Sequence, residues 1–180
     1  MNKTLATIAA LVATAAAAQD PPAGYTCCNL HHDKGRISDV NWTHAPMIPA
    51  GAAIRVLNYG NYEANVEIDG QPFVIAHEYG RKQESLEQFI AKVVVKANPR
   101  GKVAGWPEPV RNAVAKGTVI NGMTREQVIV SVGYPPVHRT PTLDAPVWNH
   151  WQSRAGRFEI YWGADGTVER TNGVKDRPGS

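Results

Sequence analysis

The chain has 180 residues, of which 43% are hydrophobic and 19% are charged, a balance typical of a globular protein rather than a disordered or fibrous one. This length suffices for one compact domain or two small ones. The formal net charge of +3 is mild and no clustered basic run accompanies it, so the composition does not favour a nucleic-acid-binding protein.

Residues 1–18 have the features of a secretory signal peptide. A lysine precedes an apolar run over residues 5–12, and Ala16 and Ala18 are the small residues of a cleavage site. We therefore predict that this segment is removed, that the mature chain begins at Gln19 and that the protein is exported. An uncleaved anchor is the alternative. No later stretch of the sequence approaches the ~20 apolar residues that cross a bilayer.

Residues 19–52 are rich in proline and predict an irregular N-terminal arm. Within it lie thiol and imidazole side chains that suit zinc or copper, namely Cys27, Cys28, His31 and His32. Adjacent cysteines rarely bind one ion together, so the metal site competes with structural thiols, a local disulfide and pairing with another chain.

Residues 53–98 predict a small unit of three antiparallel strands followed by a helix. Apolar residues alternate with polar ones on either side of Asp69-Gly70, which is a strong hairpin signal. Ser85 and Gln88 then form a helix capping box. After this box, apolar residues recur at helical spacing: Leu86, Phe89, Ile90, Val93 and Val94. We expect this face to pack on the strands; the alternative is that it binds a partner.

The next segment, residues 99–109, is rich in proline and glycine and is a candidate boundary. A short helix is expected over 107–116 and a second over 124–132. Thr124 and Gln127 form a capping box at the start of the second helix, and a glycine follows its last residue.

Three strands are expected after these helices, over 147–152, 157–162 and 167–171, with residues 173–180 as a flexible tail. The fold class is therefore α+β, with two helices covering a three-stranded antiparallel sheet. Val128 and Val132 should be buried against three side chains that share one strand face, Phe158, Ile160 and Trp162. Arg125 and Glu126 should be exposed.

The run Gly-Met-Thr-Arg-Glu-Gln-Val at 122–128, with Val-Gly-Tyr-Pro-Pro at 132–136, resembles the signature of the BamE family of SmpA/OmlA-like envelope proteins. The resemblance covers residues 107–172 and includes the Trp-bearing strand at 147–151. It implies the helix–helix–three-strand order and a non-enzymatic role in outer-membrane assembly or integrity. Members of the family are usually lipoproteins. Because Cys27 and Cys28 follow no lipobox, we expect no lipid here.

The sequence carries no complete catalytic motif. His77-Glu78 begins a metalloprotease pair, but Arg81 stands where the second histidine would be. Neither a nucleophile-elbow motif nor a glycine-rich phosphate loop is present. We therefore predict a protein that is not an enzyme and needs no cofactor.

These observations favour a periplasmic protein, with possible peripheral association with the outer membrane, that binds an envelope protein partner and no nucleic acid. Aromatic residues and arginine are favoured at protein interfaces. The candidate partner-binding residues are Tyr161, Arg157, Trp148 and Trp151, although strand alternation sends half of the aromatic residues inward. The alternative function is periplasmic metal or small-ligand binding by the Cys27, Cys28, His31 and His32 cluster.

Overall fold

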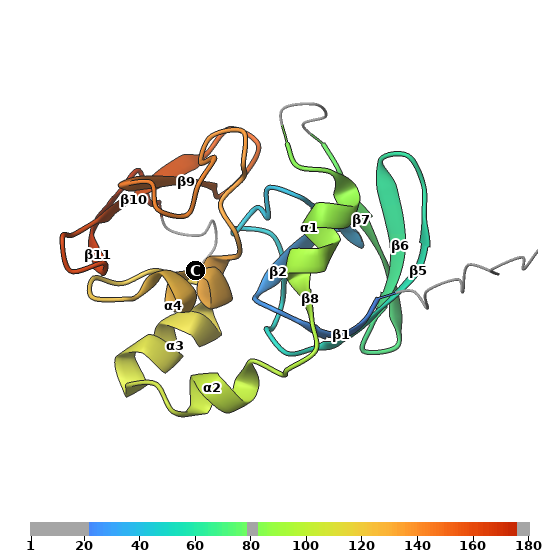
Figure 1. Ribbon diagram of the computed structural model, residues 1–180, viewed down its shortest axis with the longest axis horizontal. Coiled ribbons are helices and arrows are strands. Elements are labelled where there is room, and N and C mark those ends of the chain that lie inside the picture. The colour runs from blue at the N-terminus through green and yellow to red at the C-terminus, as the bar shows by residue number, and fades with distance from the viewer. Residues whose placement is uncertain (1–21, 79–82, 176–180) are drawn as a thin grey trace, which may run out of the picture.

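The computed structural model describes residues 22–78 and 83–175, which form an α+β fold with two β-sheets and, within those residues, four short helices (Figure 1). The predicted signal peptide lies outside the described residues, as do residues 176–180 of the predicted tail. The two sheets lie on opposite sides of the molecule, with helices between them (Figure 1).

The larger sheet is mixed and curls into a half-barrel. Its strand order is β4-β2-β3-β7-β6-β5-β1-β8, and only the pairing of β3 with β7 is parallel among the described strands. The strands span Ala23–Thr26 (β1), Leu30–Asp33 (β2), Arg36–Ser38 (β3), Met47–Ile48 (β4), Ala53–Tyr59 (β5), Glu63–Ile68 (β6), Gln71–Ala76 (β7) and Val94–Val95 (β8).

The three predicted strands are present as β5, β6 and β7, but they belong to the eight-stranded sheet and do not form a separate three-stranded unit. Adjacent strands pair antiparallel, with Ile54 opposite Ile68 and Val66 opposite Phe73. Asp69 and Gly70 turn the chain between β6 and β7, and both have positive φ, at 46° and 77°. Such backbone angles explain why an Asp-Gly pair marks this hairpin.

The prediction of an irregular arm over residues 19–52 is wrong for its described part, because strands β1 to β4 lie within it. These strands are only two to four residues long, and turns separate them closely. They place Leu30 and Ile37 in the core, at 1% and 0% exposure. Strands β2 and β3 form a local hairpin across Lys34 and Gly35. The pairings of β1 with β5 and β8 and of β3 with β7 join segments that are distant in sequence, so no local pattern predicts them.

Helix α1 (Leu86–Val93) packs into the curled sheet. Ser85 caps it as predicted, with both hydrogen bonds of the capping box formed. Four of the five residues of the predicted stripe are buried in the core of the larger sheet: Leu86, Phe89, Ile90 and Val93. Val94 is half-buried and begins β8 instead. The stripe is therefore a core face.

The remaining elements form the second part of the molecule. Helix α2 (Arg100–Ala104) was not predicted; it lies in the segment expected to be a boundary. The two predicted helices are α3 (Glu108–Lys116) and α4 (Arg125–Val132). The predicted three-stranded antiparallel sheet is also present, in the order β11-β10-β9, with bounds Val147–Trp151 (β9), Arg157–Trp162 (β10) and Val168–Asn172 (β11).

Helix α4 begins and ends where the sequence predicts. Thr124 forms the capping box with Gln127, and Gly133 ends the helix with a φ of +84°. Val128 and Val132 are buried at 0% and 1% exposure, in one core with the inward-facing residues of β10: Phe158, Ile160 and Trp162. The predicted packing of this helix on the sheet is confirmed.

Glu126 is exposed as predicted, whereas Arg125 is half-buried. The guanidinium of Arg125 lies 4.7 Å from the ring centroid of Trp162, and its Nε donates a 2.8 Å hydrogen bond to the Leu143 carbonyl. The long side chain therefore folds over the aromatic ring, and its apolar stem is partly covered.

A second face of α4 is also buried, against α3 and the turn before β2. Val130 and Ser131 are 6% and 0% exposed. Asn29 reaches across from the turn before β2, and its Nδ2 donates to the Ser131 carbonyl at 2.9 Å and to the Val114 carbonyl at 2.7 Å. The two sheets are therefore joined through a buried polar contact at α4.

Candidate functional site

The outer face of the C-terminal sheet carries Tyr161 and Arg157, two of the four residues that the sequence predicts for partner binding. The strand register places Tyr161 beside Arg170 and Glu159 beside Asn172, while Arg157 stands at the start of β10. Arg157 and Arg170 are exposed, and Tyr161 and Glu159 are half-buried. We refer to Arg157, Glu159, Tyr161, Arg170 and Asn172 as the outer-face cluster.

Glu159 is the centre of the outer-face cluster. Its carboxylate accepts hydrogen bonds from Tyr161 Oη at 2.8 Å, Arg157 Nη2 at 3.3 Å and Asn172 Nδ2 at 3.4 Å. The Tyr161 hydroxyl is the main reason that the pKa of Glu159 lies below its ordinary value, and the neighbouring arginines act in the same direction. The Arg170 guanidinium lies 3.5 Å from the Tyr161 ring centroid. These contacts connect the five side chains into one network on the outer face.

The two tryptophans predicted for partner binding do not belong to this surface. Trp148 is 0% exposed, faces inward and packs edge-to-face on Trp162 at 4.7 Å between ring centroids. Trp151 lies opposite Arg157 but is only 9% exposed, because His138 packs on its ring at 5.5 Å. The alternation of residues along a strand predicts which face a side chain is on, but it does not show that the segment carrying His138 covers Trp151.

The proposed metal ligands are not brought together. Cys27 and Cys28 form a disulfide with each other, so neither sulfur is a thiolate. His31 and His32 are adjacent on β2 and therefore point to opposite faces of the sheet. His31 is buried with its Nδ1 3.2 Å from Asn41 Oδ1, whereas His32 packs on Phe73 at 5.1 Å.

Among the described residues, no group of three or more histidine, cysteine, aspartate or glutamate side chains is arranged to hold a metal ion. Of the possibilities that the sequence leaves open for the cysteines, the structure has the local disulfide.

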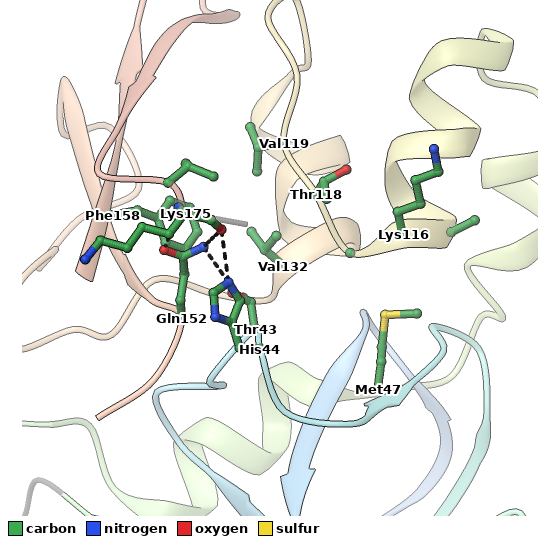
Figure 2. Close-up of a pocket in the computed structure, with 13 residues that line it drawn as sticks. Thr43, His44, Met47, Lys116, Thr118, Val119, Val132, Gln152, Phe158 and Lys175 are labelled. Atoms are coloured by element: carbon green, nitrogen blue, oxygen red, sulfur yellow. Dashed lines mark hydrogen bonds between the residues drawn. The ribbon is translucent and has the colours of Figure 1, made fainter. Parts of the chain in front are cut away.

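A hollow of about 450 Å³ lies between the two parts of the molecule (Figure 2). Its apolar lining includes Met47, Val132 and Phe158. Gln152 donates from Nε2 to His44 Nε2 at 2.6 Å and to the Lys175 carbonyl at 2.7 Å, and these bonds hold the described end of the chain beside the hollow. Lys175, in the predicted flexible tail, is therefore hydrogen-bonded to the rest of the fold.

Sequence reasoning missed this hollow because its residues come from six separated segments with no shared motif. The described residues that line it include no carboxylate, cysteine or serine.

His77 belongs to the one partly matched catalytic motif. Its Nδ1 lies 3.0 Å from Asp39 Oδ2. Burial raises the pKa of the Asp39 carboxyl, although a hydrogen bond from the Glu78 N–H and the nearby His77 act in the opposite direction. Ser38 Oγ donates to Glu78 Oε2 at 3.0 Å rather than to the imidazole. The pair thus lacks the nucleophile–base contact of hydrolytic sites.

None of the described helices is both long enough and apolar enough to cross a membrane. The class that the structure defines is an α+β protein in which a curled mixed sheet packs on α1 and a three-stranded antiparallel sheet packs on α3 and α4. Comparisons with protein-family models, with curated proteins and with solved structures found no match. The resemblance to the BamE family therefore stays a prediction from sequence.

Proposed function

We propose that this is an exported, non-enzymatic protein that binds a protein partner in the cell envelope through the outer face of its C-terminal sheet. The observation that carries the proposal is the outer-face cluster, in which Arg157 and Arg170 are exposed around Tyr161. No described helix packs on this face, whereas helices α3 and α4 share the core on the inner side.

The chemistry of the cluster favours an acidic partner surface. Two arginines flank one glutamate, so the five side chains carry a net positive charge. Arginine forms paired hydrogen bonds to carboxylates and stacks on aromatic rings, which makes it a frequent interface residue. Because Glu159 and Tyr161 already contact their neighbours in the unbound protein, part of the side-chain entropy that binding costs is lost beforehand.

The cellular role rests on the sequence. The signal-peptide pattern of residues 1–18 supports export, and the resemblance at 107–172 supports a role in outer-membrane assembly or integrity. In this proposal the protein acts from the periplasm or the periplasmic face of the outer membrane, without lipid, cofactor or nucleic acid. The fold alone does not define function, so the surface must be tested directly.

The test is site-specific photocrosslinking in intact cells. A photoreactive amino acid at Asn172 should give a discrete crosslinked product with an envelope protein, and the same group at Glu67 on the other sheet should not. Charge reversal at Arg157 and Arg170 together should reduce the Asn172 product at least roughly tenfold, since two charge contacts are replaced by repulsions.

The matched control is the double variant Arg139→Glu/Arg154→Glu, which makes the same charge change at two other exposed positions. This control should leave the crosslink unchanged. Equal crosslinking from Asn172 in both double variants would show that the outer face is not the docking surface.

A further inference from the structure

A second hollow, of about 440 Å³, lies where the end of the larger sheet meets α2 and α4. This volume falls within the roughly 300–1,000 Å³ of small-molecule sites. We call it the disulfide pocket because Cys27 lines it. The other lining residues that bear on its ligand are Ala97, Asn98, Lys102, Trp106, Glu126, Ile129 and Tyr134.

The walls of the disulfide pocket are apolar and aromatic. Trp106, Ile129 and Tyr134 line it and are only half-buried, so each has surface left for another contact. Trp106 and Ile129 pack on the core of the C-terminal part, and Tyr134 packs on the core of the larger sheet. Aromatic rings prefer offset or edge-to-face partners, and sulfur atoms make favourable contacts with rings. These walls therefore favour a ligand that contains a ring.

The charges at the disulfide pocket cancel. Its charged lining residues are Lys102 and Glu126, which pair with each other at 2.5 Å. The side chain of Asn98 is occupied as well, since Nδ2 donates to the Gly51 carbonyl at 3.3 Å and Oδ1 accepts from the Arg100 N–H at 2.9 Å. A charged ligand would lose hydration without meeting an opposite charge, so the lining favours a neutral one.

We propose that the disulfide pocket binds a neutral, ring-bearing small molecule and that the Cys27–Cys28 disulfide forms part of its wall. The site lies apart from the outer-face cluster and does not depend on partner binding there. Suppose that the ligand binds the disulfide form more tightly than the dithiol form. Because coupled equilibria affect each other equally, bound ligand then stabilises the disulfide against reduction by the ratio of the two affinities.

The probe is N-phenyl-1-naphthylamine, a neutral dye whose fluorescence rises in apolar surroundings. The full mature protein, shown by mass under non-reducing conditions to hold the disulfide, should bind it at a single site. The comparison compound is 8-anilino-1-naphthalenesulfonate, which has the same rings and adds a negative charge. We expect the neutral dye to bind at least roughly tenfold more tightly than the sulfonate.

Two alanine-to-tryptophan variants test the location. Ala97 and Ala91 are both exposed, but only Ala97 lines the disulfide pocket. Ala97→Trp should fill the pocket and weaken dye binding at least roughly tenfold, whereas Ala91→Trp should bind as the unmodified protein does. Trp106→Leu keeps an apolar wall without the ring and should weaken binding roughly two- to tenfold. Thermal melts confirm that each variant is folded.

The role of the disulfide is tested by Cys27→Ser/Cys28→Ser, which should bind the dye more weakly. It is tested independently with dithiothreitol, which passes two electrons and two protons to the protein disulfide and closes into its own ring. The dye should raise the dithiothreitol concentration needed for half-reduction. Unchanged dye binding in Ala97→Trp, equal affinity for the two dyes, or a reduction equilibrium that the dye does not move would each overturn the proposal.

Discussion

The side chain of Asn41 donates a hydrogen bond of 2.9 Å to the main-chain carbonyl of Val132, 91 residues further along the chain. The last carbonyls of a helix have no partner within the helix, and Asn41 supplies one from the other part of the molecule. The same Nδ2 donates to the Asn29 carbonyl, and Oδ1 accepts the His31 N–H at 2.7 Å. One amide thus ties the end of α4 to the turn before β2.

Replacement of Asn41 by alanine should be strongly destabilising. The side chain is 3% exposed, so its loss leaves two carbonyls and one N–H without this partner in a region that excludes water. Asn41 also has a φ of +50°, which asparagine tolerates better than alanine does. We expect the free energy of unfolding to fall by roughly 3 kcal/mol, measured by urea denaturation.

The control for this change is Asn58→Ala, because the Asn58 side chain is exposed and accepts its hydrogen bond from Asn65 in contact with water. Its cost should stay below about 1 kcal/mol. Similar losses from the two variants would mean that Asn41 does not join the two parts as the structure indicates.

The core role of α1 gives a second prediction. Phe89 is 4% exposed within the core of the larger sheet, so Phe89→Ala should lower the free energy of unfolding by about 3–5 kcal/mol. Glu87→Ala, at an exposed position in the first turn, should cost less than about 1 kcal/mol. A small loss at Phe89 would favour the alternative that the stripe faces a partner.

Local patterns predicted much of this fold because the relevant hydrogen bonds are local. The capping boxes at Ser85 and Thr124, the Asp69-Gly70 turn and the alternation on β10 each depend on residues a few positions apart. The burial of Val128 and Val132 followed from the same local spacing. These features are the ones that the structure confirms.

The features of the fold that the sequence did not predict depend mainly on contacts between residues that are distant in sequence. The pairing of β3 with β7, which joins Ile37 to Ile75, has no counterpart in the periodicity of either segment. The packing of His138 on Trp151 also joins residues that are apart in the sequence, as does the hydrogen bond between Gln152 and His44. Neither contact can be predicted before the fold is known. Of the predicted site residues, Tyr161 and Arg157 share a surface with Arg170, which the sequence did not single out.

The buried His150 predicts a dependence of stability on pH. Its ring stacks on Phe158 at 5.4 Å between centroids, and burial lowers the pKa of the imidazole from 6.5 to about 3. The imidazole of His150 is therefore protonated near pH 6.5 in the unfolded chain but only near pH 3 in the folded protein. The stability contribution is fully present above the unfolded pKa and is lost progressively as the pH falls between these two values.

Between pH 7.5 and pH 4.5 this single group should remove roughly 2–3 kcal/mol from the free energy of unfolding. The measurement is urea denaturation at both pH values, compared with His150→Leu. The other titrating groups are the same in both proteins. On going from pH 7.5 to pH 4.5, the free energy of unfolding should therefore fall by roughly 2–3 kcal/mol less in His150→Leu than in the unmodified protein. Parallel pH profiles for the two proteins would show that His150 titrates normally in the folded state.

The neighbouring residues Tyr161 and Trp162 give the last prediction, because they face opposite sides of the same strand. Trp162 is 8% exposed and contacts both Trp148 and Arg125, so Trp162→Ala should lower the free energy of unfolding by about 3–5 kcal/mol. Tyr161 lies on the outer face, where its contacts are the Arg170 guanidinium and the Glu159 carboxylate. Since contacts of this kind at exposed sites contribute little, Tyr161→Ala should cost less than about 1.5 kcal/mol and Tyr161→Phe still less. Thermal and urea denaturation of the three variants measure this contrast. A larger loss from Tyr161→Ala than from Trp162→Ala would mean that the faces of β10 are reversed, and the docking surface would then have to be sought among the residues now assigned to the core.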